Sequence, residues 1–195
     1  FDVGASGTNI TLSLVTGIEK ITVASGNTKG AFLTLTNGQF VTSTLASTSG
    51  NGTTAAIVGL IDGSGMTGSG PLVVDGSAEL DSKLEMIGGA GADILTGGSK
   101  ADTISGNGGN DILNGGTGID IITGGAGNDE LNLTDVSDFI GLTAVETFDG
   151  GTGTDTVTFD EDATTTVAAS DLLGLKNVEK LSFEGTGANT VTLSD

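Results

Sequence analysis

The sequence contains no cysteine, histidine, tryptophan or tyrosine, and only one proline among 195 residues. The lack of cysteine and histidine excludes disulfides, thiol nucleophiles, imidazole bases and the usual zinc and haem sites. Six basic residues oppose 25 acidic ones, and the net charge of −19 argues against electrostatic binding to nucleic acid or an anionic membrane. No apolar run approaches the roughly 20 residues that a membrane-inserted helix needs. The remaining metal ligands are oxygen atoms, which favour hard cations such as calcium.

Glycine and small polar residues take the place of the missing types. The sequence has 35 glycines, 36% hydrophobic residues and a mean hydropathy of +0.18. This composition is too apolar for a simple acidic disordered tail, so we expect an ordered chain without an aromatic-rich core. Because the sequence begins at Phe1 with no charged segment before an apolar stretch, we expect a fragment or a processed product.

A nine-residue repeat dominates the middle of the chain. Five units follow one another from Gly88 to Asn132, namely GGAGADILT, GGSKADTIS, GNGGNDILN, GGTGIDIIT and GGAGNDELN, and a sixth copy, GGTGTDTVT, starts at Gly150. Position six of every unit is an aspartate: Asp93, Asp102, Asp111, Asp120, Asp129 and Asp155. Position eight is always a branched aliphatic residue: Leu95, Ile104, Leu113, Ile122, Leu131 and Val157. A repeat in unbroken phase indicates a solenoid.

The spacing within each unit has a physical reason. Glycines at positions one, two and four permit positive φ and bring carbonyl groups close to a common point. The last three residues alternate in direction, so position eight faces inward on a short strand. Two units then form one coil with a turn on each edge. The fold class predicted is all-β: a parallel β-roll or β-helix solenoid with a thin aliphatic core between two parallel sheets.

This winding would bring the aspartates into two rows. Asp93, Asp111 and Asp129 would stack on one edge, and Asp102 and Asp120 on the other. Carboxylates on adjacent coils would lie about 4.8 Å apart, where their repulsion is roughly 1 kcal/mol per pair even in bulk water. A divalent cation between successive turns reverses the sign of this interaction. We therefore expect the coil to form only with the ion.

The repeats resemble the RTX family of calcium-binding nonapeptide repeats. In that family each ion takes aspartate carboxylates and backbone carbonyls from two turns that lie two repeats apart. The resemblance implies at least three Ca²⁺ ions, between the Gly88 and Gly106 turns, the Gly106 and Gly124 turns, and the Gly97 and Gly115 turns. Lys100 departs from the consensus fourth glycine, which makes the Gly97 site the weakest match. Asp155 keeps its motif and is expected to bind calcium with a partner that the sequence does not identify.

The same resemblance implies a set of turn residues that supply or position the ligands. Besides the six aspartates these are Gly88, Gly89, Ala90, Gly91, Gly97, Gly98, Ser99, Gly106, Asn107, Gly108, Gly109, Gly115, Gly116, Thr117, Gly118, Gly124, Gly125, Ala126 and Gly127.

Two regions are expected along the chain. Residues 1–80 form a Ser/Thr/Gly-rich β segment, whose alternating runs predict strands within 9–15, 31–36, 55–60 and 71–74. Residues 81–195 form the RTX roll, with the nonapeptides at 88–132, and continue into degenerate rungs. The segment SDFIGLTAVETF from Ser137 recurs as SDLLGLKNVEKL from Ser170, which supports such rungs. Asp138 either caps a short helix or binds calcium, and the sequence leaves both readings open.

The family resemblance also implies a location. RTX chains are unfolded in the calcium-poor cytosol, leave Gram-negative bacteria through a one-step channel and fold outside the cell. The Thr-rich rungs are similar to those of bacterial surface-layer proteins. We therefore expect no enzyme but a calcium-dependent structural protein, a subunit or fragment of a cell-surface layer or filament. Its expected partners are further copies of itself and a cell-surface polysaccharide.

Two other functions are compatible with the sequence. The first is an RTX folding and secretion module of a type I-secreted enzyme or adhesin whose active domain lies outside this chain. The second is an enzyme within these residues, which would depend on the carboxylates of Asp160 and Asp162. A GxGxxG match at 63–68 is followed by Ser69-Gly70-Pro71, which disfavours the helix that a dinucleotide site needs. The match therefore predicts a turn and no dinucleotide site.

Overall fold

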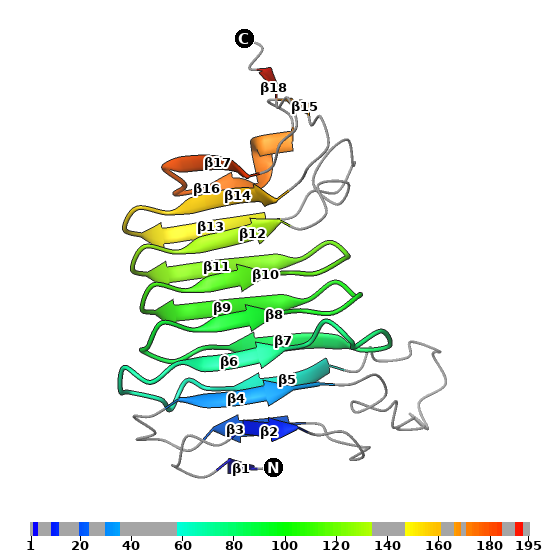
Figure 1. Ribbon diagram of the computed structural model, residues 1–195, viewed down its shortest axis with the longest axis vertical. Helices are drawn as coiled ribbons and strands as arrows, with labels where there is room; N and C mark the ends of the chain where they lie inside the picture. Colours follow the sequence, from blue (N-terminus) through cyan, green and yellow to red (C-terminus); the bar gives the residue numbers. More distant parts are fainter. Residues whose placement is uncertain are drawn as a thin grey trace, which may run out of the picture.

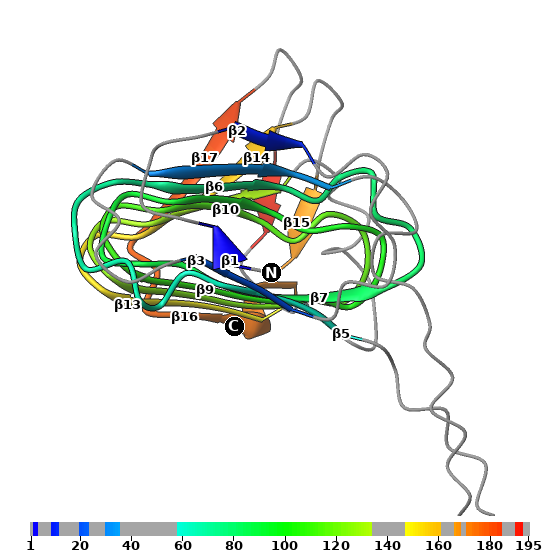
Figure 2. The same ribbon diagram turned by 90° about the horizontal axis from the view of Figure 1, so that it is seen from below.

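The chain winds into a roll of two parallel β-sheets that face each other. The computed structural model describes residues 2–3, 9–11, 20–23, 30–35, 58–133, 147–160, 166–168, 171–184 and 190–192. Figure 1 shows successive rungs stacked along the long axis, and Figure 2 shows the two sheets as opposite walls of a flattened tube. The predicted all-β parallel roll is confirmed.

Successive strands alternate between the two sheets. The first sheet has the order β1 (Asp2–Val3), β3 (Lys20–Val23), β5 (Val58–Asp62), β7 (Lys83–Ile87), β9 (Thr103–Gly108), β11 (Ile121–Ala126), β13 (Thr147–Thr152) and β16 (Leu175–Lys176). The second has the order β2 (Asn9–Thr11), β4 (Ala31–Thr34), β6 (Leu72–Asp75), β8 (Ile94–Thr96), β10 (Ile112–Asn114), β12 (Glu130–Leu133), β14 (Thr156–Asp160) and β17 (Lys180–Glu184).

A small addition lies at the C-terminal end of the roll. Strands β15 (Thr166–Ala168) and β18 (Thr190–Thr192) pair in a separate two-stranded sheet, and a short 3-10 helix, η2, spans Asp171–Gly174. Helix η2 begins at Asp171, the residue that matches Asp138 in the second copy of the repeated segment. Asp138 itself lies outside the described residues. Among the described residues, no helix is long and apolar enough to cross a bilayer.

The predicted strands of the N-terminal region belong to the same two sheets. They include β2, β4, β5 and β6, while residues 12–15 and 55–57 of the predicted ranges lie outside the described residues. Both sheets run across residue 80, because β5 pairs with β7 and β6 pairs with β8 in parallel register.

The core consists of inward-facing, mostly aliphatic side chains from both sheets. The position-eight residues of all six repeats are at most 1% exposed, and their neighbours in each strand are exposed or half-buried, as the alternation predicts, except Thr158, which is 2% exposed. In register, Leu95 opposes Leu113, which opposes Leu131. Two residues further along the strands, Leu133 opposes Phe159, whose ring stacks on that of Phe183 at a centroid distance of 4.8 Å. Strands β6, β12 and β14 each bury two apolar side chains, and this burial is the main apolar contribution to stability.

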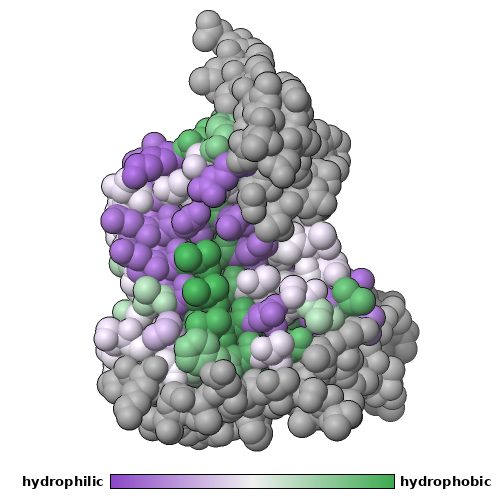
Figure 3. All heavy atoms as spheres, viewed as in Figure 1, coloured by the Kyte–Doolittle hydropathy of each residue, from purple (hydrophilic) through white to green (hydrophobic). Residues whose placement is uncertain are grey.

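The outer face of the second sheet carries an apolar stripe. Phe32, Val73, Ile94 and Ile112 lie in register on adjacent strands, and three of them are about two-fifths exposed, at 38%, 41% and 41% for Phe32, Ile94 and Ile112. The space-filling view shows this stripe in green along the middle of the roll (Figure 3). It ends at Glu130, the next residue in the register.

Candidate metal centres

The first edge of the roll consists of the turns that lead from the first sheet to the second. They include 88–93, 106–111, 124–129 and 150–155. The main-chain N–H of Asp93 donates to Oδ1 of Asp111 at 2.7 Å. In the same way the N–H of Asp111 donates to Oδ1 of Asp129 at 2.9 Å, and the N–H of Asp129 to Oδ1 of Asp155 at 2.8 Å. The predicted stacking of Asp93, Asp111 and Asp129 is confirmed.

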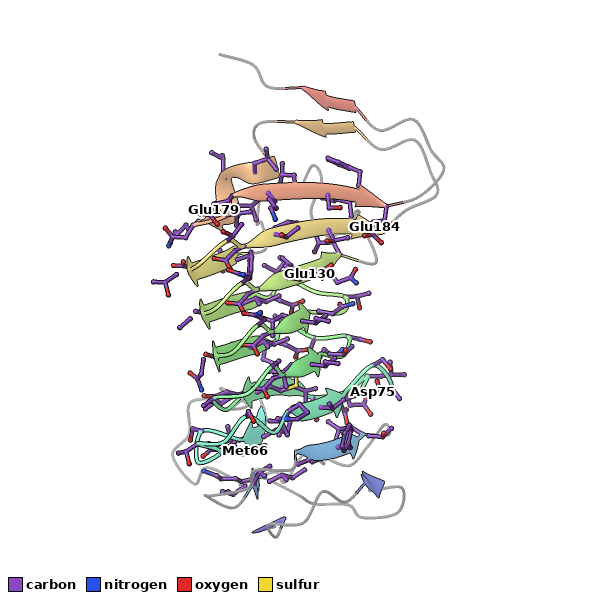
Figure 4. The ribbon with its side chains drawn as sticks, turned by 60° about the vertical axis from the view of Figure 1, so that its left-hand side comes forward. Met66, Asp75, Glu130, Glu179 and Glu184 are labelled. Atoms are coloured by element: carbon purple, nitrogen blue, oxygen red, sulfur yellow. The ribbon has the colours of Figure 1, made fainter. Side chains whose placement is uncertain are left out.

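The partner that the sequence did not identify for Asp155 is thus Asp129. Their hydrogen bond spans 26 residues, whereas the others in the row span 18. The segment between β12 and β13 is longer than a nonapeptide turn, so the phase is lost in sequence while the row continues in space. Beyond Asp155 the row ends on Glu179, whose Oε2 accepts from the Asp155 N–H at 2.8 Å. Figure 4 places Glu179 on this edge, near the C-terminal end of the stack.

The second edge consists of the turns that lead from the second sheet back to the first. The Asp102 N–H donates to Oδ1 of Asp120 at 2.7 Å, and the Leu84 N–H donates to Oδ1 of Asp102 at 2.8 Å. The predicted row of Asp102 and Asp120 is confirmed. Lys100 does not disturb it, since the hydrogen bond from Asp102 to Asp120 is as short as the one from Asp93 to Asp111 on the first edge.

The glycines at position one of the repeats are required for a reason other than the predicted positive φ. Gly106 and its equivalents do not adopt positive φ, so that part of the prediction is wrong. A Cβ on Gly106 would instead collide with the Oδ2 atom of Asp111 and lie 2.7 Å from the carbonyl oxygen of Gly124. Glycine is therefore needed there because the carboxylate and the next turn approach the backbone closely.

Positive φ occurs at positions two and four, but only in the last four units. It is found at Asn107, Gly109, Gly116, Gly118, Gly125, Gly127, Gly151 and Gly153. The first two units lack it at Gly89, Gly91, Gly98 and Lys100, because their turns pack on turns 63–71 and 76–82, which are not nonapeptide turns. This explains why a lysine is tolerated in the second unit. An L side chain there needs no left-handed backbone.

Burial dominates the electrostatics of both rows. All six repeat aspartates are at most 1% exposed. Loss of solvation raises the pKa of Asp93 and of Asp102 to about 6, against hydrogen bonds from main-chain N–H groups that lower it. For Asp111 burial raises the pKa to about 7, and the charges of Asp93 and Asp129 add to this. The pKa of Asp129 is raised chiefly by burial as well. Rows of ionised carboxylates are therefore unfavourable without a compensating cation.

Several of these carboxylates have one oxygen with no hydrogen-bond partner. In Asp111, Asp129 and Asp155, Oδ1 accepts the N–H of the preceding turn, while Oδ2 is buried and unpartnered. A buried charged oxygen without a partner is costly, which makes these atoms suited to a cation. Among the described residues no three acidic side chains converge on one point. Backbone carbonyls of the stacked turns must then complete the oxygen shell that calcium requires.

Each predicted pair of turns is therefore stacked as a calcium site between coils requires. The Gly88 turn lies on the Gly106 turn, the Gly106 turn on the Gly124 turn, and the Gly97 turn on the Gly115 turn. The Asp129 and Asp155 turns form a further pair of this kind. Which ions occupy these positions stays a prediction.

The sequence reasoning missed two kinds of residue on these edges. One is a pair of glutamates in turns without a nonapeptide motif. Glu79 is buried, and Glu179 accepts the last hydrogen bond described in the first row. The other is an asparagine ladder, in which Oδ1 of Asn110 accepts from the Asn128 N–H at 2.8 Å and Oδ1 of Asn128 accepts from Thr154 at 2.9 Å. The recurring Asn-Asp pair at positions five and six was the available signal for this ladder.

The comparisons with known proteins agree with this geometry. A family model of the RTX calcium-binding nonapeptide repeat (4 copies) matches residues 87–122 and 106–140. The searches of curated proteins and of solved structures found no match to the chain.

Proposed function

Because the chain contains RTX repeats, which bind several calcium ions and are typical of secreted extracellular proteins, we propose that it is a structural segment of a calcium-dependent surface layer or filament. The observation that carries the calcium dependence is the pattern of buried, unpartnered Oδ2 atoms in Asp111, Asp129 and Asp155. The RTX repeat is a structural motif and is not itself catalytic. The cell is proposed to be a Gram-negative bacterium.

The same atoms explain how calcium would control folding. Without the ion, each coil added to the roll buries another carboxylate beside one of like charge. With the ion, the oxygen that lacks a partner gains one, and the repulsion between adjacent turns becomes attraction. The chain is thus proposed to stay unfolded in a calcium-poor cytosol and to fold where calcium is abundant.

The outer surface supports a role in assembly. The stripe of Phe32, Val73, Ile94 and Ile112 exposes apolar area on a flat, regular face, and such patches commonly mark contacts between proteins. A rigid stack with one apolar face suits repeated contacts between identical copies. A surface polysaccharide is the proposed anchor on the cell, since the charge of −19 excludes attachment to an anionic membrane by electrostatics.

A folding module of a secreted enzyme or adhesin is the second candidate. It is favoured by the direct stacking of the non-repeat turns 63–71 and 76–82 on the first nonapeptide turns, as seen in the hydrogen bonds from Ala90 to Met66 and from Ser99 to Glu79. A calcium-loaded block in this arrangement would template the rungs that precede it. Of the acidic residues weighed for catalysis, Asp160 ends strand β14 and Asp162 lies outside the described residues.

Negative-stain electron microscopy separates these functions. The purified chain is imaged in chelator and after addition of calcium, with magnesium as the control ion. Ordered sheets or fibres that need calcium support the surface-layer role. Folded but dispersed single particles in calcium would contradict it and support the folding module.

A further inference from the structure

Two turns on opposite edges of the roll have the same construction. The first is Asp62–Met66, with sequence DGSGM, and the second is Asp75–Glu79, with sequence DGSAE. In each, the first aspartate Oδ1 accepts from the serine N–H at 3.1 Å and from the serine Oγ at 2.6 Å. In each, the N–H of the last residue donates to the glycine carbonyl at 2.8 Å. The two turns differ mainly in that last side chain, which is methionine in one and glutamate in the other.

Both last residues take the same place beneath the first nonapeptide turn of their edge. The Met66 carbonyl accepts from Ala90 at 2.9 Å, and the Glu79 carbonyl accepts from Ser99 at 3.0 Å. Both side chains are buried, at 1% and 0% exposure. Figure 4 shows Met66 and Asp75, which begins the Glu79 turn, on opposite edges of the stack. The place is therefore filled by an apolar side chain on the first edge and by a carboxylate on the second.

The Glu79 carboxylate repeats the bonding pattern of the repeat aspartates. Its Oε1 accepts from the N–H groups of Asp81 and Ser82 at 3.0 and 3.2 Å. Its Oε2 is buried and has no hydrogen-bond partner. One oxygen held by main-chain amides and one without a partner is the arrangement of Asp111 and Asp129. The carboxylate also lies near Asp102, whose pKa is raised mainly by burial and further by the Glu79 charge.

We propose that Glu79 is a ligand of an additional calcium site at the start of the second edge. The site lies between the turns 76–82 and 97–102, where Glu79 Oε2, the Asp102 carboxylate and backbone carbonyls of the two turns supply oxygen donors. No nonapeptide precedes Asp102 on this edge, so the repeat pattern alone places no ion there. On the first edge Met66 fills the corresponding place, and that row begins without an ion. The proposal does not depend on whether the chain forms a surface layer.

The test counts calcium ions bound per chain by equilibrium dialysis. Glu79→Gln keeps the volume of the side chain and the Oε1 acceptor, and Glu79→Met copies the side chain that Met66 shows to fit this turn. Both are expected to bind one ion fewer than the unmodified chain. Glu85→Gln is the matched control, because it removes one charge from an exposed position of the adjacent strand β7 and is expected to leave the count unchanged.

Circular dichroism in calcium establishes that each variant is folded. An unchanged count in a folded Glu79→Gln or Glu79→Met chain would overturn the proposal. The reciprocal change Met66→Glu transfers the carboxylate to the first edge and is expected to add one ion beside Asp93. No gain in a folded Met66→Glu chain would refute the equivalence of the two turns on which the site rests.

Discussion

The main-chain N–H of Asp111 donates to Oδ1 of Asp129, one coil further along, at 2.9 Å. The carboxylate thus holds the preceding turn in place with one oxygen while its other oxygen is buried without a partner. One side chain serves the fold with the first atom and is available to calcium with the second. Substitutions that separate these two roles are the sharpest tests of the structure.

Asp111→Asn is expected to separate them. An asparagine keeps the oxygen that accepts from Asp93 but removes the charge that attracts calcium and repels its neighbours. A larger fraction of the calcium-free chain should therefore be folded, and the further gain in folded fraction on adding calcium should shrink. Circular dichroism with and without chelator measures both, and Glu85→Gln serves as the control. An undiminished calcium effect would show that Asp111 binds no ion.

Gly106→Ala is expected to destabilise the roll by about 1–3 kcal/mol, the usual cost of forcing an atom into a packed site. The new Cβ would press on the Asp111 carboxylate and on the Gly124 carbonyl. Gly108→Ala is the matched control, since its Cβ would meet only the Ala90 Cα at 3.9 Å and should change stability by less than about 0.5 kcal/mol. Urea unfolding in excess calcium gives both values. Equal effects of the two variants would contradict the close approach at position one.

The calcium-free chain is expected to be more stable in mild acid than at neutral pH. Burial raises the pKa of Asp93 and Asp102 to about 6 and that of Asp111 to about 7, above the value of about 3.9 in an unfolded chain. The folded state therefore binds these protons more tightly, and this stabilisation is complete below about pH 4 and lost as the pH rises through about 7.

The measurement is the folded fraction in chelator across this pH range, followed by circular dichroism. It should fall as the pH increases, whereas in calcium the dependence should weaken or reverse, because protons compete with the ion for the same oxygens. A calcium-free folded fraction that rises between about pH 5 and 8 would mean that the carboxylates are ionised in the folded roll without penalty.

The apolar stripe gives a test of assembly that leaves the fold intact. Changing both Ile94 and Ile112 to serine removes exposed apolar area from the second sheet without touching the core. We expect the calcium-induced circular dichroism spectrum to persist while ordered assemblies in the microscope are lost. Ile121→Ser is the control, because Ile121 is 57% exposed on the first sheet, away from the stripe. Assemblies that survive the double change would show that another face makes the contacts.

The repeats predicted the parts of the fold that depend on strict periodicity. Two units per coil, the inward aliphatic residue and the separate rows of Asp93 and Asp102 all follow from a constant nine-residue phase, and the structure has them. Where the phase breaks, the sequence carried less information. The pairing of Asp129 with Asp155 depends on a connection of different length, which position counting does not reveal.

The remaining differences come from neighbours that the repeat does not encode. The glycines of the first two units keep ordinary backbone angles because non-repeat turns lie against them. Glu179 extends the first row from a turn with no glycine, since the only requirement is an acceptor for the Asp155 N–H. The turns ending in Met66 and Glu79 share a short DGS motif, which is too common in ordinary turns to predict a buried carboxylate.

The donor and acceptor order along the rows gives the stack a polarity. Each turn offers its amide to a carboxylate that belongs to the following turn, from Leu72 through Asp93 to Glu179. Deleting rungs from the C-terminal end would take the charged acceptor away from the last remaining amide, whereas deleting them from the N-terminal end would leave a carboxylate that a cation can still bind. The roll should therefore fray unequally, and shortened chains that keep the C-terminal rungs should lose less order than those that keep the N-terminal ones.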